Sequence, residues 1–281
     1  TVSGANLTNQ TADNTISAEG KYTATVTTYD NVDNSNTNTY NINIDKTAPT
    51  NAAPTASSTT NSVTVTFAQT DSLSGINAST KQYAIYKDGA WSAWQTSNSF
   101  TGLKHNTAYT VKTKVSDNAG NSAESNTTAI STKNLAAASL TFKVGNNDYT
   151  LNSWTSSNVS VTLNKASSGT STYESISGSA QTIAAGTTAA TTISTSGTTT
   201  LRAKVTDGTN TVYSNNYVVK VDKTAPGTTA PTASTTTNSI TVTCKQTDNL
   251  SGINASTTQY AIYKGSSWSA WQTSNTFTGL T

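Results

Sequence analysis

The chain has 281 residues, of which 61 are Thr, 38 Ser and 30 Asn, while only 11% are charged. One Cys and one His exclude a disulfide scaffold and cysteine-rich or multi-histidine metal sites. A net charge of +2 gives no electrostatic basis for nucleic-acid binding. The longest apolar stretch, near residues 135–140, is far shorter than the roughly 20 residues that span a bilayer, so we expect no membrane insertion. Because Met is absent, we expect an interior fragment of a longer protein.

An internal repeat organises the chain. Residues 46–104 and 223–281 are identical at 45 of 59 positions, with a constant offset of 177 residues. The repeat divides at two Asp-Lys-Thr-Ala-Pro junctions into two types of module. We therefore expect four segments, two of them whole modules and two partial: 1–45, 46–133, 134–222 and 223–281.

Alternating apolar residues predict short β-strands in both module types. The alternation runs through 63–67, 83–86, 109–115, 140–144, 159–163 and 201–205. Period two over many short runs, with frequent turn residues between them, is typical of a β-sandwich. We expect an all-β fold of tandem β-sandwiches that are incomplete at both ends of the chain, where sheet edges are exposed.

Two differences between the copies bear on the strands. Asp88-Gly89 becomes Gly265-Ser266, and these pairs favour type I′ and type II′ hairpin turns respectively. Both copies therefore predict a tight two-residue hairpin. Phe67 becomes Cys244, and the alternation places this position on the inward face, so we expect the lone Cys to be a small buried hydrophobic residue.

Several short motifs of the module 46–133 point to one family. They are NSVTV (61–65), YAIYKDG (83–89), FTGL (100–103), NTAYTV (106–111) and DNAGN (117–121). Together they resemble a bacterial fibronectin type III domain. The spacing from Leu103 to Tyr109 is similar to the tyrosine corner, which implies a Tyr hydroxyl bonded to nearby backbone. The sequence departs from the family at Phe67 and Cys244, where the family usually has Trp, and at His105, where it usually has Pro.

The other module type carries GKYTATV at 20–26 and IDKTAP at 44–49. These residues resemble a bacterial Ig-like domain, without the Cys pair of antibody domains. The resemblance implies a β-sandwich and an extracellular location, on a bacterial surface or secreted. It implies no activity, because β-sandwiches carry many functions.

Aromatic residues of the module 46–133 and its repeat copy are the candidate ligand contacts. They are Trp91, Trp94 and Tyr86, with the repeat copies Trp268, Trp271 and Tyr263. Aromatic ring faces suit the C–H faces of sugars. The alternative is packing in the core or over a sheet edge. Residues three apart in a strand point to opposite faces, so we expect at least one Trp of each pair to pack inward.

The remaining titratable residues favour structural roles. His105 lies in a polar turn without a nucleophile motif, so we expect a solvated loop residue and no catalytic residue. Calcium takes 6–8 oxygen ligands, usually from carboxylates in one short stretch, and no such run occurs. We therefore expect turn roles and no metal or other cofactor, with an interdomain calcium ion as the alternative. This applies to the following aspartates: Asp30, Asp45, Asp71, Asp117, Asp207, Asp222 and Asp248.

Two functional hypotheses remain, and neither is catalytic. The first is a stalk or spacer segment of a bacterial cell-surface or secreted protein, which projects a distal functional domain. Its partners are neighbouring repeats of the same chain, and no nucleic acid. The second is a glycan- or protein-binding adhesin repeat, or an accessory module of a secreted polysaccharide-degrading enzyme. Its partners are cell-wall or host glycans or proteins.

Overall fold

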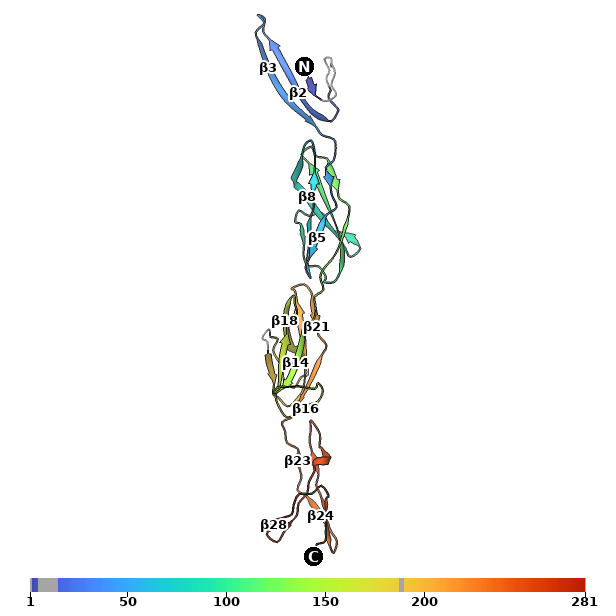
Figure 1. Cartoon of the computed structure of the whole chain (residues 1–281), viewed down its shortest axis with the longest axis vertical. Coiled ribbons are helices and arrows are strands. Elements are labelled where there is room, and N and C mark those ends of the chain that lie inside the picture. The colour runs from blue at the N-terminus through green and yellow to red at the C-terminus, as the bar shows by residue number, and fades with distance from the viewer. Residues whose placement is uncertain (1, 5–14, 187–189, 281) are drawn as a thin grey trace. The chain divides into compact units, whose positions relative to one another are not determined.

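The structure is a computed structural model that describes residues 2–4, 15–186 and 190–280. The chain divides into two compact units, residues 1–135 with 207–210 and residues 136–206 with 211–281. Figure 1 shows that β-strands make up both units, and one short 3-10 helix, η1 (Ala255–Thr257), is described besides them. No helix among the described residues has the length and apolar character needed to cross a membrane. The predicted all-β fold is confirmed.

The first unit begins with an antiparallel sheet in the order β1-β2-β3. Its strands are β1 (Val2–Gly4), β2 (Gly20–Tyr29) and β3 (Ser35–Ile44), and they are rich in the β-branched residues that favour pleated structure. Large side chains on this sheet remain in solvent, with Val26 51% and Tyr40 57% exposed. A complete sandwich buries one face of each sheet. The exposure therefore agrees with the incomplete sandwich predicted at this end.

Residues 50–131 form a β-sandwich in the same unit. One sheet has the order β10-β6-β5 and comprises β10 (Ser99–Phe100), β6 (Val63–Thr66) and β5 (Thr55–Ser58). The other has the order β12-β11-β8-β9 and comprises β12 (Ser122–Glu124), β11 (Ala108–Asp117), β8 (Ile76–Lys87) and β9 (Ala90–Trp91), with β13 (Thr128–Ser131) also paired to β11. A short pair, β4 (Thr50–Asn51) and β7 (Gln69–Thr70), completes the sandwich.

The inward faces of these two sheets meet in one core. Alternate residues of each strand contribute, because side chains of a strand point to opposite faces in turn. The buried members are Val63, Val65, Ile85, Phe100, Leu103, Tyr109 and Val111. At the edge of this core the Tyr109 hydroxyl accepts a hydrogen bond from the Lys104 N–H at 3.0 Å. The expected tyrosine corner is therefore present.

The second unit begins with a sandwich of two further sheets. One has the order β15-β14-β17-β19 and comprises β15 (Asn147–Asp148), β14 (Ser139–Val144), β17 (Val159–Asn164) and β19 (Ala190–Ile193). The other has the order β16-β22-β20-β18 and comprises β16 (Trp154–Thr155), β22 (Tyr217–Val221), β20 (Gly197–Thr206) and β18 (Thr170–Ser175), with β21 (Thr211–Tyr213) paired to β20. Val161, Ile193, Leu201 and Val219 are fully buried between the two sheets.

The rest of the second unit, residues 227–278, forms three small sheets. They pair β23 (Gly227–Thr228) with β26 (Gln246–Thr247), join β24 (Thr232–Thr235), β25 (Ser239–Thr243) and β29 (Thr276–Thr278), and pair β27 (Tyr263–Lys264) with β28 (Ser267–Trp268). Their core is open, so Ile240 and Val242 are half-buried where Val63 and Val65 are fully buried. Cys244 is also only partly buried, so the prediction that this residue is buried is wrong.

The two predicted hairpins are confirmed. Lys87 pairs with Ala90 around Asp88-Gly89, and Lys264 pairs with Ser267 around Gly265-Ser266. Asp88 and Gly89 both have positive φ, of 51° and 86°, as a type I′ turn requires. In the second copy Gly265 takes the positive φ, of 66°, at the first turn position, where a type II′ turn requires it.

Candidate functional site

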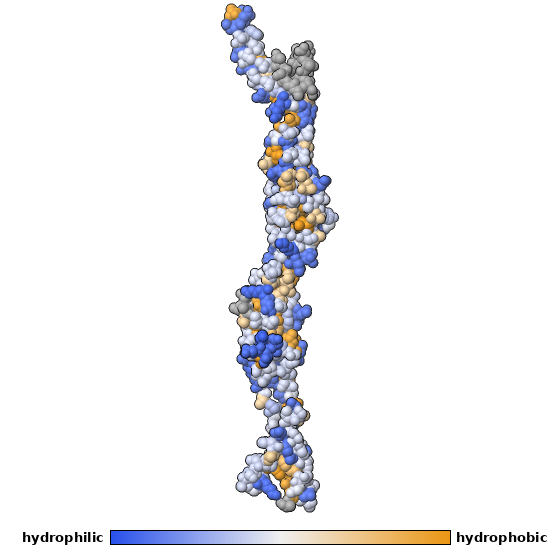
Figure 2. Space-filling model, in the orientation of Figure 1, coloured by the Kyte–Doolittle hydropathy of each residue, from blue (hydrophilic) through white to orange (hydrophobic). Residues whose placement is uncertain are grey.

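Three aromatic residues and one lysine lie together on the outer side of the sheet β12-β11-β8-β9. We call Tyr86, Trp91, Trp94 and Lys112 the aromatic face. Tyr86 and Trp91 are cross-strand partners of the hairpin, with ring centroids 5.5 Å apart and an edge-to-face geometry. Tyr86 is 41% and Trp91 37% exposed. Figure 2 shows that hydrophobic residues lie in small, scattered groups on the visible side of the molecule.

A β-bulge places both tryptophans on the same side. Tyr86 pairs with Trp91, and Tyr83 forms a bridge with Gln95, so two residues of β8 lie opposite the three residues 92–94. The extra residue reverses the alternation. Ser92 fixes the bulge, because its N–H donates to the Ile85 carbonyl at 2.9 Å and its hydroxyl accepts from the Ile85 N–H at 3.2 Å. The expectation that one Trp packs inward is therefore wrong for this pair.

Lys112 lies between the two indole rings. Its Nζ is 4.8 Å from the centroid of Trp91 and 5.0 Å from that of Trp94. The same ammonium forms an ion pair with Glu124 at 2.9 Å. Cation–π contacts of this kind are worth about 0.5–1 kcal/mol at exposed sites. The aromatic face thus exposes ring surface and one cation beside the Glu124 carboxylate, and these contacts also stabilise its own sheet.

A similar group on another sheet shows that the combination also serves structure. Arg202 lies 3.9 Å from the ring centroid of Tyr213, measured from its guanidinium carbon, and pairs with Glu174 at 2.6 Å. Arg202 and Glu174 are cross-strand partners on β20 and β18. A cation stacked on an aromatic ring and paired with Glu is therefore a repeated way of covering an outer sheet face in this chain. It is not by itself a sign of a ligand site.

The second copy of the aromatic residues is more exposed. Tyr263 is 59%, Trp268 68% and Trp271 69% exposed. The Tyr263 and Trp268 rings remain 5.4 Å apart, and Ser269 makes the same backbone contacts to Ile262 as Ser92 makes to Ile85. The hairpin and its bulge are thus properties of the local sequence. In the first copy Lys112 stacks on the Trp91 and Trp94 rings and covers part of their surface.

Three aspartates from distant parts of the sequence converge at one end of the sandwich 50–131. One carboxylate oxygen each from Asp45, Asp71 and Asp117 lies within 4.8 Å of the others. Sequence reasoning missed this cluster, because it sought carboxylates within one short stretch. In the sequence, Asp71 and Asp117 each follow a predicted strand, 63–67 and 109–115, by a few residues.

The hydrogen bonds of the cluster confirm the predicted turn roles. Asp71 accepts from the Leu73 and Gly75 N–H groups at 3.1 and 2.6 Å. Asp117, which is 1% exposed, accepts from the Ala119 and Asn121 N–H groups at 2.9 and 2.8 Å. As a ligand set the cluster supplies three carboxylates, whereas calcium takes 6–8 oxygens. Turn bonding accounts for the positions of Asp71 and Asp117 on its own.

Asp45 has a different role from the two turn aspartates. Its Oδ2 accepts the Ser74 N–H at 3.0 Å, and its backbone carbonyl accepts from the Asn121 side chain at 3.1 Å. Hydrogen bonds from the N–H groups of Ser74 and Thr47 stabilise the charged carboxylate and hold the pKa of Asp45 below its usual value of 3.8. A charged carboxylate thus ties the predicted junction to a loop of the following sandwich.

Asp222, the repeat copy of Asp45, has the same arrangement. Its Oδ2 accepts the Ser251 N–H at 3.0 Å and its Oδ1 accepts the Thr224 N–H at 3.0 Å. The Ser251 side chain and the N–H groups of Thr224 and Ser251 lower the pKa of Asp222 in the same way. We refer to Asp45 and Asp222 as the junction aspartates. The serines that donate to them, Ser74 and Ser251, lie 29 residues further along the chain in both copies.

His105 is not a freely solvated loop residue. Its ring is half-buried and its Nδ1 accepts the N–H of Leu135 at 3.3 Å, while its carbonyl accepts from the Thr107 hydroxyl at 2.8 Å. The imidazole therefore holds the segment that follows β13. This role of His105 is structural, and it could not be predicted from the sequence because Leu135 lies 30 residues away.

Comparisons with known proteins find likenesses among solved structures. No family model matches the chain, and no curated protein matches it. Among solved structures, the chain is similar to the crystal structure of chicken CNTN1 FN1-FN3 domains, with 12% identity and a TM-score of 0.26 over 83% of this chain and 89% of that chain. The description of the fold therefore rests on the sheets and cores given above.

Proposed function

We propose that this chain is a non-catalytic stalk or spacer segment of a bacterial cell-surface or secreted protein, which projects a distal functional domain. The observation that carries the proposal is the repeated junction. Asp45 and Asp222 make the same hydrogen bond to the loop that follows, to Ser74 and Ser251, both at 3.0 Å. A junction that is built twice in the same way suits a chain of modules connected with little bending.

The residues that follow each junction aspartate support this reading. Both copies continue as Lys-Thr-Ala-Pro, and Pro restricts the backbone because its ring fixes φ near −65°. Flexible linkers instead are rich in Gly and Ser. With a carboxylate bonded to the next loop and Pro close behind it, the junction has few ways to bend.

The proposed modules are residues 1–45 and 134–222 as Ig-like domains and residues 46–133 and 223–281 as fibronectin type III-like domains, the first and last of them partial. The pairing of strands favours these limits. Each sheet described contains strands from one proposed module alone. A module that makes all its own strand pairs folds with little help from its neighbours, as a spacer of variable repeat number requires.

Small-angle scattering of the chain tests the spacer proposal. We expect a distance distribution that fits modules in series, and we expect Asp222→Ala to broaden it because the junction loses its carboxylate. Asp148→Asn is the matched control, since its side chain is 91% exposed. A compact wild-type particle contradicts the stalk, and an unchanged Asp222→Ala profile contradicts the role of the junction aspartates.

A binding function is the second candidate, and the aromatic face favours it. Trp91 and Trp94 lie on one side with Lys112 between them, so two rings and a cation are presented together. Such a surface suits a cell-wall or host glycan, or a protein. Retention on glycan arrays by the wild type, lost in Trp91→Ala/Trp94→Ala but kept in Tyr213→Ala, supports binding. If all three proteins are retained equally, or if none is retained, the aromatic face does not bind the glycans and only the spacer function remains.

A further inference from the structure

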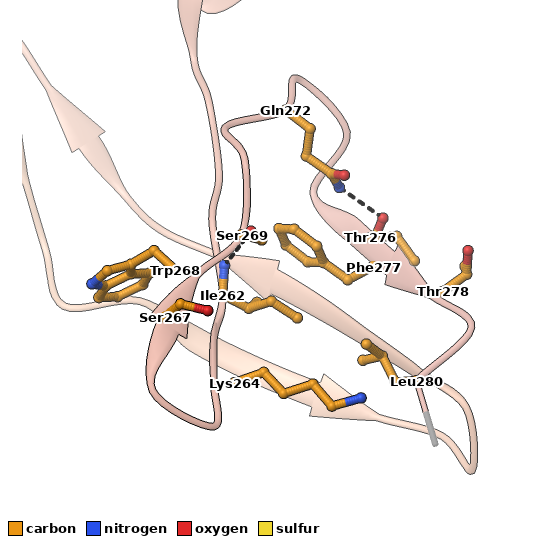
Figure 3. Close-up of a pocket in the computed structure, with 10 residues that line it drawn as sticks. All are labelled: Ile262, Lys264, Ser267, Trp268, Ser269, Gln272, Thr276, Phe277, Thr278 and Leu280. Atoms are coloured by element: carbon orange, nitrogen blue, oxygen red, sulfur yellow. Dashed lines mark hydrogen bonds between the residues drawn. The ribbon is translucent and has the colours of Figure 1, made fainter.

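The turn that carries His105 is anchored in the core of the sandwich 50–131. Leu103, two residues before His105, is 2% exposed, and its N–H donates to the Asn61 carbonyl at 2.9 Å. Figure 3 shows the repeat copy of this leucine, Leu280, lining a pocket together with Phe277. An inward-facing leucine therefore begins this turn in both copies, and it holds the backbone of His105 at the rim of the core.

His105 joins this turn to two other segments of the same compact unit. Its N–H donates to the Asn210 Oδ1 at 3.3 Å, and residues 207–210 belong to the unit that contains the sandwich. Its ring Nδ1 accepts the N–H of Leu135 at 3.3 Å. Leu135 is 2% exposed, and no second acceptor of its N–H is found among the described residues. The imidazole thus satisfies a buried backbone donor.

This hydrogen bond exists only while the imidazole is neutral. In a neutral imidazole one ring nitrogen carries the proton and the other accepts a hydrogen bond, so the Nδ1 acceptor requires the proton on Nε2. In the charged form both nitrogens are donors. Protonation of His105 therefore sets one N–H group against another and leaves the buried Leu135 N–H without its acceptor, which is costly.

The charged groups around His105 keep their charge where a histidine titrates. Lys104 precedes it and forms an ion pair with Asp88 at 3.9 Å. Lys133 lies on the segment after β13 and is exposed. Asp207 lies on the loop of residues 207–210, and its carboxylate accepts two N–H groups of that loop at 3.0 and 2.7 Å. Lysines and aspartates do not titrate between about pH 5 and 7.5, whereas histidine does.

We propose that His105 is a pH-sensitive latch on the segment that follows β13. The neutral imidazole holds the Leu135 N–H and fixes this segment on the turn at residues 103–107. The imidazolium releases the N–H, and residues 133–135 become mobile. The signal that this site takes is a proton, supplied by mild acidification of the surroundings.

The latch adds a property to the spacer function proposed above, and it does not depend on that proposal. The other end of the module 46–133 is tied by Asp45, whose carboxylate accepts the Ser74 N–H and has a pKa below 3.8. Asp45 therefore stays charged at pH 5. Mild acid loosens the segment after His105 and Leu135 and leaves the bond between Asp45 and Ser74 intact.

Nuclear magnetic resonance tests the protonation state directly. His105 is the only histidine of the chain, so one imidazole signal reports on it without assignment by mutation. At pH 7.5 the two ring nitrogen shifts should show the tautomer that carries its proton on Nε2. A proton on Nδ1 at pH 7.5 overturns the proposal, because that nitrogen then accepts no hydrogen bond.

Amide hydrogen exchange of the whole chain at pH 7.5 and pH 5, corrected for the intrinsic effect of pH, tests the release. We expect the protection of Leu135 to fall by about threefold to tenfold at pH 5, the effect of losing one typical hydrogen bond. The Ser74 amide is the internal control, because its acceptor Asp45 stays charged, and its protection should not change. Equal Leu135 protection at both pH values contradicts the latch.

Two variants separate the titration of His105 from a general effect of acid. His105→Asn places an amide oxygen, which does not titrate, at the position of Nδ1, so Leu135 should stay protected at both pH values. His105→Phe keeps a ring without an acceptor, so Leu135 should be weakly protected at both. A loss at pH 5 in His105→Asn as large as in the wild type, or full protection in His105→Phe, shows that another group controls this segment.

Discussion

The Asp222 carboxylate accepts a hydrogen bond from the backbone N–H of Ser251 at 3.0 Å. The repeat copy of this bond joins Asp45 to Ser74 at the same distance. In both, an ionised side chain receives donors from a loop 29 residues further on. Hydrogen bonds to the charged form lower the pKa of a carboxyl group, and the junction is therefore expected to depend on pH.

Acid should weaken the junctions. The pKa values of Asp45 and Asp222 in the folded protein lie below 3.8. A carboxyl group with a lowered pKa stabilises the folded state above its unfolded pKa, and this contribution is lost as pH falls through the folded pKa. We expect Asp45→Asn/Asp222→Asn to reduce the loss of thermal stability on acidification below pH 3.8, measured by calorimetry.

The exposed Ser72, in the same loop as Ser74, provides the control for this experiment. Ser72→Ala should keep the acid dependence of the wild type. The same acid dependence in the Asn variant as in the wild type would show that the junction aspartates are not the groups that titrate.

Removing the tyrosine corner should destabilise the sandwich 50–131. Tyr109→Phe keeps the buried ring but leaves the Lys104 N–H without its 3.0 Å partner. A net loss of about 0.5–1.5 kcal/mol in the free energy of unfolding is expected for one such hydrogen bond. Urea unfolding monitored by exchange protection of β11 measures it. Tyr86→Phe, at a 41% exposed ring, should change stability far less, and equal effects would refute the corner's role.

The same substitution in the two copies should differ in cost. Ile85 is 1% exposed in a complete core, whereas Ile262 lines an open cleft. Truncating a fully buried Ile to Ala typically costs about 2–5 kcal/mol, because transfer and cavity terms add. We therefore expect Ile85→Ala to reduce exchange protection across β6, β8 and β11, and Ile262→Ala to have a small local effect. Comparable losses would mean that the second core is as closed as the first.

Lys112 should matter for the environment of two tryptophans. Lys112→Ala removes the ammonium 4.8 Å and 5.0 Å from the Trp91 and Trp94 rings, together with the ion pair to Glu124. We expect a loss of about 0.5–1 kcal/mol in stability and greater acrylamide quenching of both indoles. Lys114→Ala, two residues further along β11, is the control and should leave the quenching unchanged. Unchanged quenching in Lys112→Ala as well would contradict the stacking.

Much of the fold was predictable because strand formation here follows local patterns. Alternation at 63–65 and 109–115 identified strands and their inward faces, and the turn pairs 88–89 and 265–266 identified the hairpins. The bulge at Ser92 was not predictable, because no residue type in the hairpin marks the extra residue. That residue nevertheless reverses the face of the sheet to which the later side chains of the strand point. The expectation that at least one Trp of the pair packs inward was therefore wrong for Trp91 and Trp94.

Sequence by itself determined the all-β class, the repeat, the hairpins and the tyrosine corner, since each depends on residues close together or on period two. Tertiary structure alone decided the convergence of Asp45, Asp71 and Asp117 and the role of His105, because their partners are distant in sequence. It also decided the states of residues 76–87 and 253–264. A strand requires hydrogen bonds from its neighbour, and β11 provides them in the first copy alone among the described residues.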